Sequence, residues 1–411
     1  MLDLARLLCC LALVPLLAGA SPKTVPAGSD RAFAAAWLGV VQRFEQRLAA
    51  ENVVGAAIVF TSREHGRQSA FYGQQDVLTK APVDANTIFH WASITKTFTD
   101  IAATQLAHRG LLDLDAPAVR YLPELRAIHD AFGPIENLTL LHLMTHTGGL
   151  RSATWPWGGD QPWHPHEPTQ WSQLVAMMPY TELEFRPGEK YSYSNPGYTF
   201  LGRTIEVVSG EDIESYVDKN VLRPLQMHSS YFDITPPHLS THRSNNYYFV
   251  DGKPVANGLD FDTGVTNGNG GLNASVADMT LYLEFLSRCL PTQRFPLDCG
   301  TLRSMWQPVA EVAREPGLVE SMGRGFFVVD FEAGHGSPVR RYIGHTGTQM
   351  GFRSFIYFDP DSGAGALIAV NTRTMENYRG LYNETRRDLF EHLFPLARQT
   401  QQPKHELRFG E

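Results

Sequence analysis

The segment HWASITKTFT, residues 90–99, contains a serine and a lysine three positions apart, Ser93 and Lys96. The sequence predicts a helix that begins at Ser93 and ends near Gly110, because glycine commonly terminates helices. Residues i and i+3 of a helix share one face, so the Lys96 amine can reach the Ser93 hydroxyl. A serine hydroxyl is a weak nucleophile unless a neighbouring group accepts its proton. The spacing indicates a nucleophile with its base, although the same pair also occurs on solvated helix faces.

A base role for Lys96 requires the neutral amine. At the ordinary lysine pKa of about 10.4, roughly one molecule in 2,500 is neutral at pH 7. The site must therefore lower this pKa by about three units, which corresponds to about 4 kcal/mol. Burial and the positive potential at the start of a helix can both lower the pKa. The same helix start directs backbone N–H groups toward a developing oxyanion.

A second polar segment, YSYSN at residues 191–195, can supply a further proton carrier. Tyr193 and Asn195 flank one serine, which suits a turn that presents a phenol and an amide together. A phenolate beside Lys96 can act as a general base, and its hydroxyl can then protonate the leaving group. Asn195 can donate to a substrate carbonyl and accept from Lys96. The alternative is an ordinary turn with a buried tyrosine.

A third segment, GHTGT at residues 344–348, immediately precedes a predicted hairpin. Its small residues would let an edge strand approach a substrate closely. A histidine alone, here His345, is more often a packed side chain than a catalytic group. Its place after the other two segments is what gives it weight.

Together the three segments resemble the motifs of the penicillin-recognising serine hydrolases. They are most similar to the class C β-lactamase-like branch, which holds β-lactamases, D-alanyl-D-alanine carboxypeptidases, D-aminopeptidases and esterases. LMTHTGGL (143–150), FRPGEKYSYSN (185–195) and NGGLNASVADM (269–279) agree with it, so the resemblance covers about residues 35–395. It implies an α+β fold of the β-lactamase/transpeptidase type. In this fold an antiparallel sheet is flanked by N- and C-terminal helices and carries an inserted, mostly helical lobe.

The resemblance also implies a role for each matching residue. Ser93 would be acylated, and Lys96 and Tyr193 would transfer the proton. The implied substrate-binding residues are Asn195, His345, Thr346, Gly347 and Thr348, with the oxyanion hole formed by the backbone N–H groups of Ser93 and Thr348.

One departure from the family pattern concerns the substrate. His345 stands where β-lactamases of this branch usually have lysine, and an ordinary histidine is mostly neutral at pH 7. Attraction to a β-lactam carboxylate should then be weaker. We therefore predict a serine hydrolase of the esterase or peptidase type that acts through an acyl-enzyme. A β-lactamase or D-alanyl-D-alanine carboxypeptidase is the alternative, and a non-catalytic binding or sensor protein on the same fold is the second.

Hydrophobic patterning predicts the order of elements along the chain. Helices are expected over 31–50, 138–146, 198–210 and 378–395, and hairpins over 55–62 with 69–73 and over 351–360 with 366–372. We accordingly divide the chain into a signal peptide (1–20), two parts of an α/β lobe (30–105 and 256–398), a mostly helical lobe between them (106–255) and a tail (399–411).

The first twenty residues indicate export. Arg6 precedes an apolar run that ends before Ala18-Gly19-Ala20, a small-x-small site that signal peptidase can cut. The run is too short for a membrane span, so none is expected after cleavage. We expect a periplasmic or secreted protein. In that oxidising setting Cys289 and Cys299 are expected to form a local disulfide, with two free thiols as the alternative.

Charge and composition limit the partners. The formal net charge is −8 over 411 residues, with no basic run, which disfavours nucleic acid or an anionic membrane surface. The expected partner is a small-molecule or peptide substrate, and no cofactor or metal is expected. A tryptophan-rich stretch at 154–171 could line the acyl site or simply fasten a long loop.

Overall fold

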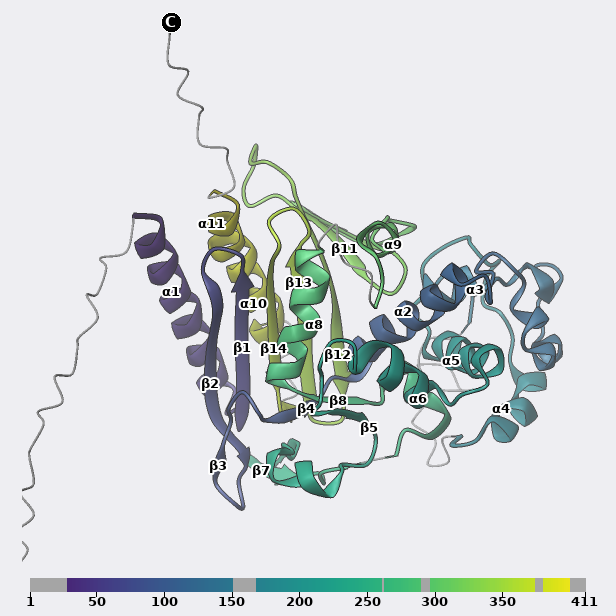
Figure 1. Ribbon diagram of the computed structural model, residues 1–411, viewed down its shortest axis with the longest axis horizontal. Helices are drawn as coiled ribbons and strands as arrows, with labels where there is room; N and C mark the ends of the chain where they lie inside the picture. The colour runs from purple at the N-terminus through teal and green to yellow at the C-terminus, as the bar shows by residue number, and fades with distance from the viewer. Residues whose placement is uncertain (1–27, 151–167, 261, 290–295, 374–379, 400–411) are drawn as a thin grey trace, which may run out of the picture.

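The computed structural model describes residues 28–150, 168–260, 262–289, 296–373 and 380–399. Its centre is a nine-stranded antiparallel sheet in the order β3-β2-β1-β14-β13-β12-β11-β10-β9 (Figure 1). The N-terminal part supplies β1 (Gly55–Ser62), β2 (Gly66–Asp76) and β3 (Ala81–Pro82). The C-terminal part supplies β9 (Ala310–Glu315), β10 (Leu318–Met322), β11 (Phe327–Phe331), β12 (Arg340–Gln349), β13 (Phe352–Asp359) and β14 (Ala364–Val370). Both predicted hairpins are present, and β1 pairs with β14, so the sheet joins the two ends of the chain.

Strand β1 shows why this sheet is covered on both faces. All eight of its residues are buried. Ala56, Ile58 and Phe60 belong to one apolar core, whereas Ala57 and Val59 belong to the other, as the two-residue period of a strand requires. One core is completed by helix α1 (Gly28–Ala50) and the C-terminal helical segments, and the other by α8 (Val276–Arg288) and the helical lobe.

The C-terminal helical stretch follows the predicted amphipathic segment but is not one regular α-helix. It is built from η9 (Gly380–Glu384), α10 (Thr385–Asp388), η10 (Leu389–Leu393) and α11 (Phe394–Gln399). Arg47 of α1 donates to Asp388 at 2.7 Å, which links the first helix to the last stretch of chain. In Figure 1 both lie on the same side of the sheet. The expected α+β fold, with an antiparallel sheet flanked by N- and C-terminal helices, is confirmed, and these helices pack together against one face of the sheet.

The helical lobe lies beside the sheet, at the right of Figure 1. Its α-helices are α2 (Thr95–His108), α3 (Leu140–Met144), α4 (Trp171–Met177), α5 (Asn195–Ser209) and α6 (Ile213–Val217). Short 3₁₀ or π turns connect and extend them: η2 (Ala118–Arg120), η3 (Pro123–Ala127), η4 (Ile135–Asn137), η5 (Met178–Tyr180) and η6 (Asp218–Leu222). The helices predicted over 138–146 and 198–210 correspond to α3 and α5, and each proves to differ from its predicted bounds at one or both ends.

Two small sheets were not expected from the sequence. The order β4-β8-β5 joins Ile88–His90, Leu272–Ser275 and Ser230–Phe232. The order β15-β6-β7 joins Thr372–Arg373, Tyr247–Val250 and Lys253–Ala256. These strands have two to four residues each, too few for a periodic pattern to identify them. Further short elements are η7 (Pro237–His242), η8 (Gly264–Thr266), α7 (Asn267–Gly270) and α9 (Cys299–Met305).

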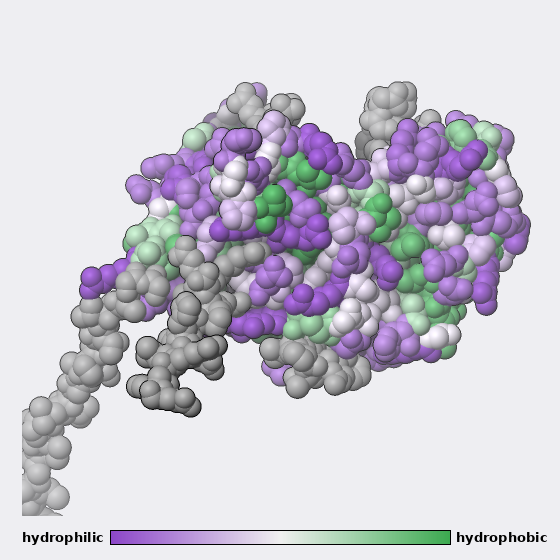
Figure 2. All heavy atoms as spheres, turned by 90° about the horizontal axis from the view of Figure 1, so that it is seen from above, coloured by the Kyte–Doolittle hydropathy of each residue, from purple (hydrophilic) through white to green (hydrophobic). Residues whose placement is uncertain are grey.

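The expected disulfide is present, joining Cys289 at the end of α8 to Cys299 at the start of α9. The face in Figure 2 is mainly hydrophilic, with apolar residues in separate patches. None of the helices in the described part of the chain combines the length and apolar character of a membrane span. The predicted signal peptide, the tail from residue 400 and most of the tryptophan-rich stretch lie outside the described residues.

Candidate active site

Ser93 lies in a 3₁₀ turn, η1 (Ala92–Ile94), immediately before α2. The predicted helix over 93–110 therefore begins with this tighter turn, and its regular part covers Thr95–His108. Ala92 has a φ of +49°, a left-handed conformation that costs a non-glycine residue about 1–2 kcal/mol. The chain thus turns sharply at Ser93, which lines a cavity of about 560 Å³.

Lys96 is fully buried behind Ser93. Its Nζ donates to Ser93 Oγ at 3.3 Å and to the Asn269 carbonyl oxygen at 2.7 Å. Sequence reasoning had expected Asn195 to accept from this amine, and Asn269 takes that position instead. Burial holds the pKa of Lys96 well below its usual value, and nearby Asp100 opposes the shift. This contact and the lowered pKa are the two conditions that proton transfer from Ser93 to the amine would require.

The YSYSN segment leads directly into α5. Ser194 caps this helix by accepting from Gly197 N at 3.1 Å, so Tyr193 precedes the helix and Asn195 is its first residue. Asn195 lines the cavity with Ser93. The Lys96 Nζ lies 5.0 Å from the ring centroid of Tyr193, which places the aromatic ring next to the amine.

His146 packs against Tyr193. The two rings lie 4.2 Å apart between centroids, and the backbone N–H of Ser194 donates to His146 Nδ1 at 3.0 Å. Because Nδ1 accepts this bond, the neutral imidazole carries its proton on Nε2. Burial, with the adjacent Lys96, holds the pKa of His146 well below its usual value. His146 is thus a neutral support for the tyrosine, and sequence analysis did not single it out.

The GHTGT segment occupies the end of β12. The sequence had suggested an edge strand here. In the structure β12 is an inner strand of the sheet, because it lies between β13 and β11. However, β11 pairs only as far as Gly344, so β12 has one free side from His345 onward. There Gly347 packs against the Ser93 segment, and an added Cβ would come 2.2 Å from the Trp91 carbonyl oxygen. Thr348 follows and lines the cavity.

His345 is buried rather than exposed to the cavity. Its Nδ1 donates to the carbonyl oxygen of Thr346 at 2.7 Å, and its ring packs 5.0 Å from that of Phe327. Burial, reinforced by Lys96, lowers its pKa to about 3. At pH 7 a histidine with this pKa is almost entirely neutral, whereas an ordinary histidine would still be partly protonated. This supports the expectation that His345 is neutral.

Buried neutral histidines should make the protein sensitive to acid. The pKa of His345 is about 3 in the folded protein and about 6.5 in the unfolded chain. Below pH 6.5 the unfolded chain therefore binds a proton that the folded protein does not, and the free energy of unfolding falls as the pH falls. Between pH 7 and 5 the free energy of unfolding should fall by about 2 kcal/mol more in the wild type than in His345→Gln. Guanidinium titrations at the two pH values measure this. Equal losses in both proteins would contradict it. Asp233, whose pKa burial raises to about 6, changes the free energy of unfolding in the opposite direction over this pH range. Its contribution is the same in the wild type and in the variant, so it cancels in the difference between them.

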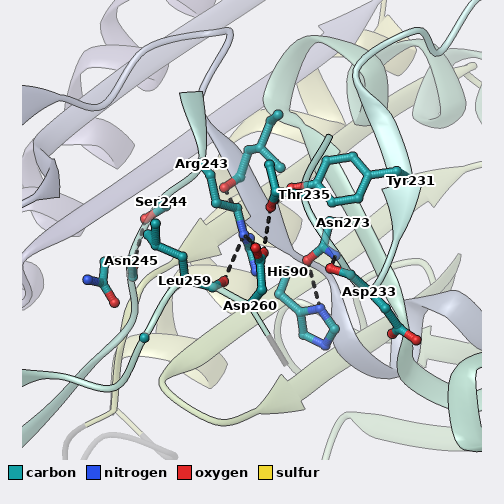
Figure 3. A network of polar contacts seen from close by, with 12 residues as sticks. His90, Tyr231, Asp233, Thr235, Arg243, Ser244, Asn245, Leu259, Asp260 and Asn273 are labelled. Atoms are coloured by element: carbon teal, nitrogen blue, oxygen red, sulfur yellow. Dashed lines mark hydrogen bonds and ion pairs between the residues drawn. The ribbon is translucent and has the colours of Figure 1, made fainter. Parts of the chain in front are cut away.

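A buried polar network supports the strand that leads to Ser93 (Figure 3). Arg243, whose side chain is 1% exposed, pairs with Asp260 at 3.5 Å and donates to the carbonyl oxygens of Leu259 and Ile88. Figure 3 also shows His90 beside Asn273, with 3.0 Å between Nδ1 and Oδ1. Burial lowers the pKa of His90 to about 4. The network thus holds in place β4, which ends three residues before Ser93.

Sequence reasoning missed other cavity residues. Asn269 lies in a segment noted only for its family pattern, yet it lines the cavity and binds Lys96. Arg373 and Tyr248 also line it, with the guanidinium carbon 5.9 Å from the ring centroid. They come from β15 and β6, two short strands without a sequence signal.

Among the described residues, one group could hold a metal: Asp30, Glu64 and His65. These residues belong to α1 and the β1–β2 turn, which contribute nothing to the Ser93 cavity. Of the tryptophan-rich stretch, only its end is described; Trp171 begins α4, and Pro168 lines the cavity.

The fold and the arrangement around Ser93 define a β-lactamase/transpeptidase-like protein. It superposes on a class C β-lactamase mutant with a TM-score of 0.71 at 19% identity, covering 87% of this chain and 97% of that one. It also superposes on the octameric penicillin-binding protein homologue from Pyrococcus abyssi, with a TM-score of 0.70 at 25% identity, covering 89% and 77%.

A sequence profile of the Beta-lactamase family matches residues 40–389, and the chain belongs to this family of serine hydrolases. It is 24% identical to a beta-lactamase of Pseudomonas fluorescens over 78% of this chain and 89% of that protein. It is also 24% identical to protein flp of Staphylococcus aureus strain MW2 over 80% of this chain. The matched region spans 61% of the length of protein flp.

Proposed function

We propose that this protein is an exported serine hydrolase that acts through an acyl-enzyme on an ester or amide. The observation that carries the proposal is the contact between Ser93 Oγ and a fully buried Lys96 amine at 3.3 Å. A neutral amine there accepts the serine proton as the oxygen attacks the substrate carbonyl. Tyr193, beside the amine, gives its hydroxyl proton to the leaving group and takes the serine proton over from Lys96.

The cavity residues suggest how the substrate is held. The backbone N–H groups of Ser93 and Thr348 are the proposed oxyanion hole, and each such donor typically contributes about 3–4 kcal/mol to the transition state. Asn195 would bind the substrate amide or ester carbonyl. His345, Thr346 and Gly347 would form the strand beside the substrate, and Gly347 allows that strand to approach the nucleophile.

A substrate panel tests the reaction type. We expect the purified protein to hydrolyse p-nitrophenyl esters or short D-amino-acid peptides faster than nitrocefin, because neutral His345 supplies no positive charge at the position where β-lactamases of this branch usually have lysine. The Pseudomonas relative supports a β-lactamase as the second candidate, and dominant turnover of nitrocefin would establish it. Absence of turnover and of covalent labelling would leave a binding protein. Export is supported by the disulfide, which is typical of oxidising compartments.

Arg373 is the one charged side chain among the described residues that line the cavity, and we expect it to favour a substrate with a carboxylate. Arg373→Gln should lower kcat/KM for an anionic ester about two- to fivefold, because exposed ion pairs contribute about 0.2–1 kcal/mol. The kcat/KM for the matched neutral ester should stay within error. Equal losses on both esters would assign Arg373 a structural role.

A further inference from the structure

Asp100 is a buried carboxyl group that the proposed reaction does not use. It lies on α2 one turn after Lys96 and is 0% exposed. Its Oδ2 lies 2.5 Å from the hydroxyl oxygen of Tyr198, and its Oδ1 has no hydrogen-bond partner among the described residues. An ionised carboxylate with one oxygen buried and unpaired would be costly, whereas a neutral acid tolerates such an environment better.

The Tyr198 hydroxyl determines which group carries the proton. Its oxygen also lies 2.9 Å from the carbonyl oxygen of Met144. A phenol has one proton, and a backbone carbonyl can only accept, so the Tyr198 proton must be on the Met144 side for that contact to be a hydrogen bond. The contact with Asp100 then needs a proton from the carboxyl group. A single arrangement satisfies both contacts, with Asp100 donating to Tyr198 and Tyr198 donating to Met144.

We propose that Asp100 is a protonated carboxylic acid at neutral pH, and that it positions Tyr198 beneath Lys96 without placing a negative charge beside the amine. The ring centroid of Tyr198 lies 5.4 Å from Lys96 Nζ, so the tyrosine forms part of the floor under the amine. Gly325 closes the pocket around the acid, since a Cβ there would come 1.8 Å from Asp100 Oδ2. The protonation state of Asp100 is independent of the proposed function, and only its consequence for catalysis by Lys96 rests on that function.

The other ionisable groups that face Asp100 come from α2, from α8 and from the connection between β10 and β11. Lys96 shares its helix, Tyr282 lies on α8, and Arg324 precedes β11. Burial raises the pKa of Asp100 well above its usual value, and the Tyr198 hydrogen bond, Lys96 and Arg324 oppose this. An ionised Asp100 would raise the pKa of Lys96 and leave more of it protonated. A neutral Asp100 leaves Lys96 free to accept the serine proton.

Infrared spectroscopy tests the protonation state without any substrate. At pH 8 in D₂O, protein labelled with ¹³C at the aspartate carboxyl carbons should show a carboxylic-acid C=O band that shifts with the label. The wild-type minus Asp100→Asn spectrum should contain the same band. Asp298→Asn is the matched control, because the pKa of Asp298 is lowered by its hydrogen bonds to Thr301, so only a carboxylate band should be lost. Absence of an aspartic acid band in the labelled wild type overturns the proposal.

Kinetics test the consequence for Lys96. Asn can donate to Tyr198 as the neutral acid does, so Asp100→Asn should leave the acidic limb of the kcat/KM profile within about 0.3 pH unit. Asp100→Leu lacks the donor, and its kcat/KM should fall about fivefold or more below that of Asp100→Asn. A limb displaced by about one unit toward lower pH in Asp100→Asn means that wild-type Asp100 is ionised, and overturns the proposal. If Ser93 proves not to be acylated, the proposed function fails while the infrared result still stands.

Discussion

Labelling by a fluorophosphonate probe is expected to disappear when Ser93 is replaced by alanine. The Ser93 hydroxyl lies in the cavity and contacts the Lys96 amine, so its loss removes the attacking atom. Without it, kcat/KM on any ester or peptide that the wild type hydrolyses should fall about 10⁴-fold or more. Intact-mass spectrometry after exposure to the probe gives the first readout, and initial rates give the second.

The matched control for this loss is Ser304→Ala. Ser304 is an exposed serine on α9 whose hydroxyl donates to Thr301, outside the cavity. Its replacement should change neither labelling nor rate. The turn that contains Ser93 is held by backbone hydrogen bonds, which alanine keeps. The alanine variant should therefore also keep the melting temperature of the wild type. Covalent labelling that persists in Ser93→Ala would show that another residue is the nucleophile, and would contradict the proposed mechanism.

The sequence was sufficient for those parts of the fold that have strong periodicity. The hairpins β1–β2 and β13–β14 were predicted because β1, β13 and β14 are long, apolar and bounded by turns. The helix after Ser93 was predicted from the glycine near its end, Gly110. The i, i+3 relation then placed Lys96 on Ser93, since a local spacing of this kind is preserved wherever the helix packs.

Contacts between distant segments could not be predicted in this way. The second acceptor of Lys96 is a main-chain carbonyl, that of Asn269, and a backbone group leaves no signature in the residue types. His146 supports Tyr193 through ring packing and a bond to the Ser194 N–H, which depend on where α3 meets α5. Arg373 reaches the cavity because a two-residue strand pairs with β6. Such short pairings are set by tertiary packing rather than by local preference.

Replacing Lys96 by arginine separates proton transfer from simple charge. A guanidinium keeps a positive charge but cannot accept a proton at neutral pH, whereas the buried amine of Lys96 has a lowered pKa and can. If Lys96 is the base, Lys96→Arg and Lys96→Met should both slow acylation by about 10³-fold, within the usual range for general-base catalysis. If its charge alone mattered, arginine would retain most of the rate and methionine would not. Stopped-flow acylation at pH 7 measures this. Lys190→Met, on an exposed lysine next to the Tyr193 segment, should leave the rate unchanged. The loss in Lys96→Met should also shrink as pH rises, since hydroxide can then remove the serine proton directly.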